Sequence, residues 1–549
     1  MLRQIPRTRL SSRYVSRLSG LASRQICSTP LLRQQALPSK ETPSPAPRTG
    51  WSSTLLAAGV GSVLSGALVY YSTRPGETNT KRERVYATRG EMEKAVDEIN
   101  QRLGEDSIST DDEDLRLHGY SEWSSINIDR LPVAVAYPKS TEEVATIAKI
   151  CHKYKVPMIA YSGGSSVEGH FSAPFGGVSV DFMHMNKIVQ FHPEDMDIVV
   201  QPSVSWVEMN GEIKDSGLFF PVDPGPPAKI GGMIATNCSG TNAVRYGTMK
   251  DWVVNLTVVL ADGRIIKTRQ RPRKSSAGYN LNGLFTGSEG TLGFVTEATL
   301  KLATIPEQTG VAVTTFPTMR DAAKTAIQVV HAGIPVGAVE ILDDVQMDVV
   351  NKMGATGREW KVAPTLFFKF SGTKAGVKDN IEQVRKIVQS NGSRDFQVEE
   401  DKKRQDALWS ARKEALFSML CMRQDGSEVW STDVAVPLSR VPELVEISKA
   451  DLDKLGLFGS MLGHIGDGNF HETILFDGAK EKEKVSKCVH DMVHRALEME
   501  GTSTGEHGVG MGKKEFMERE VGQGSLDVMK RIKQSLDPHW LMNPGKIFD

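Results

Sequence analysis

Two patterns of hydrophobic and polar positions alternate from residue 130 onward: short apolar runs, which predict strands, and apolar residues at helical spacing, which predict helices. An apolar run at residues 131–137, closed by a proline, predicts a strand. Ser140 and Glu143 then match the capping box that starts many helices, and apolar residues follow at helical spacing. The chain therefore passes directly from a strand into a helix.

The same alternation returns further along the chain. Strands are predicted at residues 156–160 and 253–260, and an Asp262-Gly263 turn leads from the second into a return strand. Around Arg412 the pattern becomes that of an amphipathic helix. Residues 461–471 place two glycines and an Asp-Gly step between two histidines, which favours strand-turn geometry over a helix.

Composition and charge exclude several classes of protein. The 549 residues suffice for two or three domains, and the five scattered cysteines include no C-x-x-C pair, so neither a disulfide framework nor a cysteine metal site is expected. Residues 1–50 hold eight Arg and one Lys against one Glu, a balance of +8 that leaves −9 for the remainder. No basic stripe remains there, so no nucleic-acid partner is expected.

The first 71 residues have the composition of a targeting sequence. Residues 1–50 are rich in Arg and Ser and contain no acid before Glu41, which predicts a mitochondrial transit peptide and linker; a disordered basic tail is the other interpretation. Residues 51–71 carry no charge and would span about 31 Å as a helix, against a hydrocarbon core of about 30 Å. This segment predicts attachment to the inner membrane, or a second sorting signal that is removed. Residues 72–129 are predicted to be a linker and N-terminal extension, with the globular part starting near Arg130.

Three segments rich in small residues follow the predicted strands. Residues 162–170 form a Gly/Ser loop whose backbone N–H groups can approach an anion, although a plain surface turn has the same composition. The loop has neither the P-loop nor the Gly-x-Gly-x-x-Gly spacing. Residues 220–247 and 287–296 continue the pattern, and so many small residues predict a backbone pressed against a flat group or a phosphate.

Two glycine-framed turns carry candidate metal ligands. His464 and His471 flank the first turn, and Glu506 lies in the second, Gly505-Glu506-His507-Gly508. Two His and one carboxylate with an open position are typical of a catalytic zinc site. The alternative interpretation is that these are ordinary loop histidines. The glycines that frame both turns and the Glu506-His507 pair favour the metal site over it.

The motifs together resemble a known family. The order SGGSSVEGH, DPGPPAKIGGMIATNCSGTN, RYGTMKD, GSEGTLGFVTEATL, HIGDGNFH, GEHGVG and NPGKIFD is similar to the vanillyl-alcohol-oxidase-type flavoproteins. Within them it resembles the FAD-dependent D-2-hydroxyacid dehydrogenases, most closely the branch found in fungal mitochondria. The first loop departs slightly, since Ser162 and Ser165 stand where relatives often have Gly and Thr.

The resemblance implies an α+β architecture. It comprises a two-lobed FAD-binding domain of the vanillyl-alcohol-oxidase/PCMH type at 130–305, a substrate-binding cap with an antiparallel sheet at 306–455, and a C-terminal segment at 456–549 that returns to the flavin domain. His170 follows the loop instead of occupying the position where some relatives attach flavin, which implies non-covalent FAD. The implied cofactor-binding residues are Ser162, Gly163, Gly164, Ser165, Ser166, Gly169, His170, Pro224, Gly231, Gly232, Ala235, Asn237, Ser239, Gly240, Thr241, Tyr246, Gly247, Gly290, Gly293 and Val295.

The resemblance also implies a reaction, the oxidation of D-lactate to pyruvate by hydride transfer to FAD. A divalent metal, Zn or Mn, would be held by His464, His471 and Glu506, with His507 as general base. The implied substrate-binding residues are Arg412, which would pair with the substrate carboxylate, and Asn469.

The same resemblance bears on specificity and on the electron acceptor. Residues 428–437 contain no lysine, whereas relatives that take larger dicarboxylates carry one, so lactate is favoured over 2-hydroxyglutarate. Electrons would pass to cytochrome c in the intermembrane space. A dehydrogenase for another D-2-hydroxy acid, using quinone or another flavoprotein, and a metal-dependent hydrolase are the alternatives.

Overall fold

The computed structural model describes residues 85–393, 395–424 and 426–549. The predicted transit peptide at 1–50 and the hydrophobic segment at 51–71 lie outside these residues, as does the start of the predicted linker. Among the helices of the described part, none is both long and apolar enough to span a bilayer.

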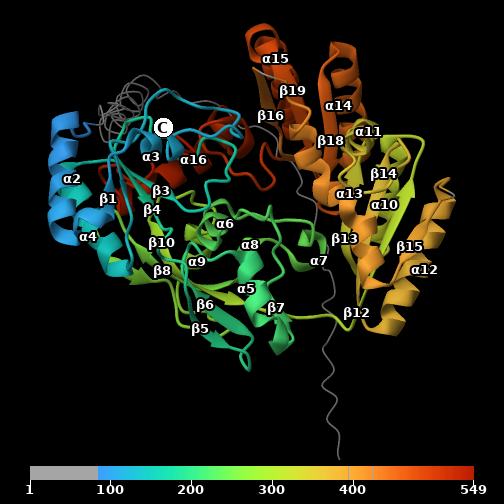
Figure 1. The fold of residues 1–549 in the computed structure, drawn as a ribbon, viewed down its shortest axis with the longest axis horizontal. Helices are drawn as coiled ribbons and strands as arrows, with labels where there is room; N and C mark the ends of the chain where they lie inside the picture. Colours follow the sequence, from blue (N-terminus) through green and yellow to red (C-terminus); the bar gives the residue numbers. More distant parts are fainter. Residues whose placement is uncertain (1–84, 394, 425) are drawn as a thin grey trace, which may run out of the picture. The chain divides into compact units, whose positions relative to one another are not determined.

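The first lobe is built on a four-stranded sheet in the order β1-β2-β4-β3, in which β2, β4 and β3 run parallel (Figure 1). The predicted N-cap of helix α4 is confirmed, since the Ser140 hydroxyl accepts a hydrogen bond from the Glu143 N–H. The reciprocal bond of a capping box is displaced by one residue, because the Glu143 carboxylate accepts from the Lys139 N–H and not from the Ser140 N–H. The elements of this lobe are α2 (Arg89–Leu103), η1 (Glu105–Ser107), β1 (Ile108–Ser109), α3 (Asp112–Leu117), β2 (Ala134–Ala136), α4 (Thr141–Tyr154), β3 (Met158–Tyr161) and β4 (Val178–Asp181).

Helix α2 corrects the predicted start of the globular part. Met92, Ala95, Val96 and Ile99 of α2 are buried in the core of the first lobe, at the i, i+3, i+4, i+7 spacing of a helix that covers a core. The lobe therefore starts before Arg130, and part of the predicted extension at 72–129 belongs to it.

The second lobe is an antiparallel sheet in the order β5-β6-β10-β8-β9, and it confirms the strands predicted around the Asp262-Gly263 turn. Strands β7 and β11 pair separately. The elements are β5 (Ile188–His192), β6 (Asp197–Val200), α5 (Trp206–Ile213), η2 (Lys214–Ser216), β7 (Leu218–Phe219), α6 (Ile230–Thr236), α7 (Ala243–Tyr246), α8 (Met249–Trp252), β8 (Val253–Val259), β9 (Ile265–Lys267), α9 (Leu281–Phe285), β10 (Phe294–Lys301) and β11 (Ala303–Thr304).

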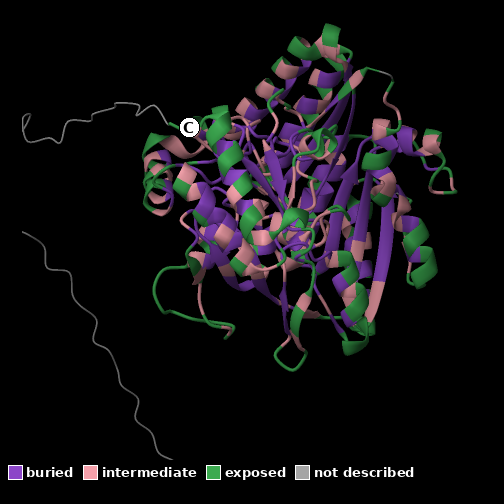
Figure 2. Ribbon diagram, turned by 60° about the vertical axis from the view of Figure 1, so that its left-hand side comes forward, coloured by how far each residue is buried: buried purple, intermediate pink, exposed green. Residues whose placement is uncertain are grey.

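The cap is a single large antiparallel sheet in the order β15-β12-β14-β13-β18-β19-β16, and β17 pairs with β19. Side chains of alternate residues enter two cores: helices α10, α12, α14 and α15 cover one face, and α11 and α13 the other. Figure 2 shows buried residues along these strands. The elements are β12 (Gln308–Thr315), α10 (Met319–His331), β13 (Val336–Leu342), α11 (Asp344–Met353), β14 (Thr365–Gly372), α12 (Lys374–Ser390), β15 (Gln397–Glu399), α13 (Lys402–Leu420), β16 (Ser427–Ser431), β17 (Val434–Ala435), η3 (Leu438–Arg440), α14 (Val441–Leu455), β18 (Phe458–Gly463), η4 (Ile465–Asp467), β19 (Asn469–Asp477) and α15 (Gly478–Glu498).

This sheet also corrects the predicted boundary after Leu455. Strands β18 and β19 pair with each other and join the cap sheet through β13 and β16, so the cap continues through α15. The returning segment is the part after α15, with η5 (Lys514–Phe516) and α16 (Met517–Leu536). Met542 forms a parallel bridge with Met158, and Leu541 and Met542 are buried in the first lobe's core.

Candidate active site

Two turns bring the three predicted metal ligands together. His464 precedes η4 between β18 and β19, and His471 lies on β19. Their Nε2 atoms lie 3.1 and 3.4 Å from Glu506 Oε1, and the two rings stand nearly perpendicular at a centroid distance of 5.6 Å. The three ligand atoms all lie within 4.8 Å of one another. The predicted strand-turn geometry is thereby confirmed at this site.

The Nδ1 atoms of the two histidines, which face away from Glu506, are held by other groups, as is usual for metal-binding histidines. His464 Nδ1 lies 2.8 Å from Glu340 Oε1, and His471 Nδ1 lies 3.0 Å from the Thr432 carbonyl oxygen. Because a carbonyl oxygen only accepts, Nδ1 of His471 carries a proton, and the neutral form of this ring would therefore present the lone pair of Nε2 to a cation. Metal-binding histidines are commonly held in this way. Three N/O ligands and an open position match a catalytic divalent-cation site.

The charges in this cluster are strongly coupled. Burial alone would lower the pKa of His464, but Glu340 and Glu506 outweigh it and raise that pKa well above its usual value. In the opposite sense, burial would raise the pKa of Glu506, yet His464 and His471 hold it well below its usual range. The cluster therefore holds two carboxylates that require a nearby positive charge.

His507 has the properties of a neutral base. Its ring stacks on His471 with centroids 5.0 Å apart, and its buried Nδ1 has no hydrogen-bond partner among the described residues. Burial lowers the pKa of His507 to about 4, so the imidazole is uncharged near neutral pH and can accept a proton.

Arg412 is joined to the predicted metal ligands through Glu340. On helix α13, its Nε donates a 2.7 Å hydrogen bond to Glu340 Oε2, while the other oxygen of Glu340 contacts His464. The terminal guanidinium nitrogens make no hydrogen bond to any residue that the structure describes, and the side chain is 13% exposed. They are therefore free to pair with a carboxylate.

Asn469 uses only half of its amide within the protein. Its Nδ2 donates to Asp433 Oδ1 and to the Val434 carbonyl, both at 2.9 Å, which holds the turn. Its Oδ1 is buried and has no partner in the described part of the chain. A substrate hydroxyl would supply the missing donor.

The Gly/Ser loop is suited to an anionic cofactor. Between residues 164 and 168 the backbone N–H groups donate to no described acceptor, which leaves donors for a phosphate. A Cβ on Gly163 would lie 2.9 Å from the Pro227 carbonyl, and Gly164 has φ +61° with its Cβ direction blocked by the Tyr161 hydroxyl, so both positions require glycine. The Cβ direction of Gly232 is open, with no protein atom within 4 Å.

The other predicted cofactor residues divide into groups. Ser239 contacts Glu506 instead, donating a 2.6 Å hydrogen bond to its Oε2, and His170 Nε2 lies 3.1 Å from Glu289 Oε2. Gly231, Gly240 and Gly293 press against neighbouring backbone, where a Cβ would clash. Ser162, Gly169, Asn237 and Thr241 use their polar groups within the protein. Pro224, Ala235, Tyr246, Gly247 and Gly290 lie on the segments between β7 and β10, Ser165 and Ser166 lie in the first loop, and Val295 lies on β10.

Three polar residues of the cap, two buried and one partly buried, were not predicted. Glu340 and Lys369 are single charges within the apolar strands β13 and β14, a signal that the sequence does contain. Lys369 Nζ lies 3.4 Å from Thr241 Oγ1 and 4.1 Å from the centre of the Trp409 ring. The third, Asp433, follows β16 and contacts the Glu506-His507 turn.

Comparisons with known proteins agree with this architecture. The FAD binding domain model matches residues 132–269, and the model of the FAD linked oxidases, C-terminal domain, matches residues 305–547. The fold and the matched models define an FAD-dependent oxidoreductase. The chain belongs to the family of FAD-linked oxidases that includes the mitochondrial D-lactate dehydrogenases (cytochrome).

Individual relatives support this assignment over most of the chain. A mitochondrial D-lactate dehydrogenase (cytochrome) from Arabidopsis thaliana is 46% identical over 84% of this chain and 81% of its own. The protein of the same name from Kluyveromyces lactis is 42% identical over 90% of both. The structure of p-cresol methylhydroxylase superposes with a TM-score of 0.70 at 20% identity, covering 84% of this chain and 98% of that one, which confirms the predicted fold type.

Proposed function

We propose that this protein oxidises D-lactate to pyruvate with FAD as hydride acceptor, assisted by a divalent cation at His464, His471 and Glu506, and that its electrons pass to cytochrome c. The observation that carries the proposal is the continuous contact from Arg412 through Glu340 to His464 and Glu506. This contact supports Arg412 as the partner of a substrate carboxylate next to the proposed cation site. A 2-hydroxy acid carries a carboxylate and a hydroxyl on adjacent carbons, so it could meet both groups. The names of the relatives support lactate and cytochrome.

Each residue has a defined task in this reaction. When bound, FAD accepts the hydride from the α-carbon, and a cation such as Zn²⁺ or Mn²⁺ lowers the pKa of the substrate hydroxyl. Arg412 fixes the substrate carboxylate with its free terminal nitrogens. The neutral imidazole of His507 takes the hydroxyl proton. Asn469 Oδ1 orients the hydroxyl.

Lys369 is the observation that favours a second candidate, a D-2-hydroxy acid with a second carboxylate. Burial lowers the pKa of Lys369, whereas the carboxylates of Asp223 and Glu340 raise it. The positive charge of Arg412 is also close enough to lower the pKa of Lys369. This lysine lies in β14 and would replace the lysine that relatives carry near residues 428–437. A relative at 29% identity is named D-2-hydroxyglutarate dehydrogenase.

Stopped-flow flavin reduction with a panel of D- and L-2-hydroxy acids tests the proposal. We expect rapid bleaching of the oxidised flavin by D-lactate and little by L-lactate. Faster reduction by D-2-hydroxyglutarate than by D-lactate would instead support the second candidate. A protein that binds no flavin, or whose flavin no hydroxy acid reduces, would refute both.

Replacing Arg412 by Lys should lower both substrate affinity and the rate of flavin reduction. Lysine keeps the charge but loses the planar fork that pairs with a carboxylate and the Nε–H that binds Glu340. We expect the KM for D-lactate to rise about tenfold, equivalent to about 1.4 kcal/mol of lost interaction. Arg404→Lys, at the exposed start of the same helix, is the control and should leave the kinetics unchanged. Wild-type kinetics for both variants would place the carboxylate site elsewhere.

Deleting residues 1–74 should give a soluble enzyme that still reduces cytochrome c with D-lactate, because the site lies entirely within the described residues. The −9 balance of the chain after residue 50 would attract a basic acceptor, so the rate should fall as salt is raised. Reduction of cytochrome c is followed by its absorbance, with an artificial dye as the control acceptor. If the dye is reduced but cytochrome c never is, the proposed acceptor is wrong.

A further inference from the structure

Asp433 is a buried carboxylate that contacts both turns of the candidate active site, the one at Asn469 and the one at Glu506-His507. It follows β16, and its side chain has no exposed surface. Oδ2 accepts hydrogen bonds from the backbone N–H groups of Glu506 (2.9 Å) and His507 (2.8 Å), and from the Thr504 hydroxyl (2.8 Å). Oδ1 accepts a fourth from Asn469 Nδ2 at 2.9 Å. One carboxylate therefore contacts both turns of the site.

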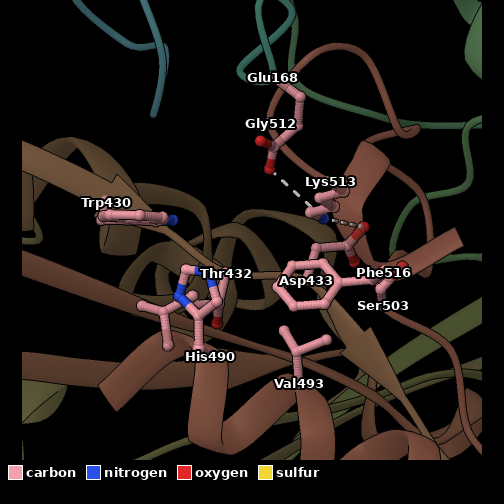
Figure 3. Close-up of a pocket in the computed structure, with 11 residues that line it drawn as sticks. Glu168, Trp430, Thr432, Asp433, His490, Val493, Ser503, Gly512, Lys513 and Phe516 are labelled. Atoms are coloured by element: carbon pink, nitrogen blue, oxygen red, sulfur yellow. Dashed lines mark hydrogen bonds and ion pairs between the residues drawn. The ribbon is translucent and has the colours of Figure 1, made fainter. Parts of the chain in front are cut away.

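A chain of opposite charges supports this carboxylate. Figure 3 shows Lys513 between Asp433 and Glu168, with its Nζ 3.5 Å from Asp433 Oδ2 and 3.4 Å from Glu168 Oε1. Burial would raise the pKa of Asp433, but His507, Lys513 and His471 outweigh it and hold the pKa well below its usual range. Asp433 is therefore a carboxylate at neutral pH. Glu168 belongs to the Gly/Ser loop, so Lys513 connects Asp433 to that loop.

The hydrogen-bond directions determine what Asp433 does. Asp433, His471 and His507 offer ligand atoms within 4.8 Å of one another, as a second cation site would. However, His471 Nδ1, which faces Asp433 Oδ1 at 3.6 Å, donates its proton to the Thr432 carbonyl, and Oδ2 of Asp433 already accepts three N–H or O–H groups. The carboxylate is therefore arranged to hold the backbone of Glu506 and His507.

We propose that Asp433 is a positioning residue that sets the metal ligand Glu506 and the base His507 in their working orientation. The inference rests on the proposed function, because it assigns the cation to His464, His471 and Glu506. The N–H groups of Glu506 and His507 have no other acceptor among the described residues, so Asp433 alone fixes both peptides. Since Asn469 is held by the same carboxylate, one residue aligns a metal ligand, a base and a substrate-binding amide.

The test compares Zn²⁺ affinity in flavin-loaded, metal-stripped wild type and Asp433→Asn. Asparagine has the same shape, but its amide replaces an acceptor oxygen by a donor and removes the charge. We expect Zn²⁺ affinity, measured by competition with a chromophoric chelator, to weaken about ten- to a hundredfold, the usual cost of losing a residue that orients metal ligands. FAD absorbance should remain, and the rate of flavin reduction should fall while the KM changes less.

Asp343→Asn is the matched control. Asp343 is equally buried in the cap and pairs with Lys449 at 3.1 Å, but it caps helix α11 and contacts none of the site residues. Its loss should lower the melting temperature and leave Zn²⁺ affinity within twofold. A role of Asp433 in stability alone would give the same result for both variants.

Thr504→Val tests the proposal if Asp433→Asn does not fold. It removes one donor to Asp433 Oδ2, and we expect Zn²⁺ affinity to fall about threefold to tenfold, below the range for the full loss. Unchanged affinity in a folded Asp433→Asn, or in Thr504→Val where the former does not fold, overturns the inference. If the wild-type protein itself binds no Zn²⁺ at these residues, the proposed metal site fails, and the inference with it.

Discussion

His507→Ala is expected to slow flavin reduction by D-lactate by roughly two to four decades, the span usually attributed to general-base catalysis. The imidazole is neutral, and its buried Nδ1 has no protein partner among the described residues, so it can take the substrate proton. Alanine leaves the Glu506 ligand and the Gly/Ser loop in place. Stopped-flow absorbance measures the reduction rate, and metal content and FAD absorbance should match the wild type.

A second histidine provides the control for this variant. His494 on α15 packs against Phe516, away from the metal ligands, so His494→Ala should reduce its flavin at the wild-type rate. A loss below about threefold in His507→Ala would be too small for general-base catalysis and would place the base elsewhere.

His471→Ala is expected to lose the cation while keeping the absorbance of bound FAD. Only His464 and Glu506 would remain of the three predicted ligands, and two ligands hold a catalytic metal poorly. A Lewis acid contributes several kcal/mol to such a reaction, so flavin reduction should slow at least about a hundredfold. Elemental analysis and stopped-flow reduction measure the two losses.

Chelation of the wild-type protein gives an independent check on the metal. The stripped protein should behave like His471→Ala, and adding back Zn²⁺ or Mn²⁺ should restore reduction only in the wild type. Wild-type rates in a preparation shown to be metal-free would contradict a catalytic role for the cation.

Local signals account for the features that the sequence predicts well. The Ser140 cap, the Asp262-Gly263 turn and the glycine-framed turn between His464 and His471 depend on residues adjacent in the chain. For the same reason, the convergence of both histidines is foreseeable from one turn. Glu506 is a candidate because of its own glycine-framed turn, but nothing local indicates that this turn meets the first.

The unpredicted features depend on contacts between distant residues. Glu340 contacts His464 across 124 positions, and Asp433 contacts His507 across 74. A single acid in an apolar strand indicates a buried polar contact, but the partner is decided by the order of strands in the sheet. The boundary after Leu455 is misplaced for a related reason: strand pairing joins β18 to β13, whereas the sequence shows only a glycine after a helix.

The bridge between Met158 and Met542 has a consequence for biosynthesis. The lobe that is translated early lacks Leu541 and Met542, two members of its core, until the final residues leave the ribosome. Folding of that lobe therefore cannot be completed in the order of translation, and its open apolar edge is a target for chaperones in the meantime. A premature stop codon shortly before Leu541 would consequently disrupt the core of the first lobe, which is translated early, as well as remove the C-terminal residues.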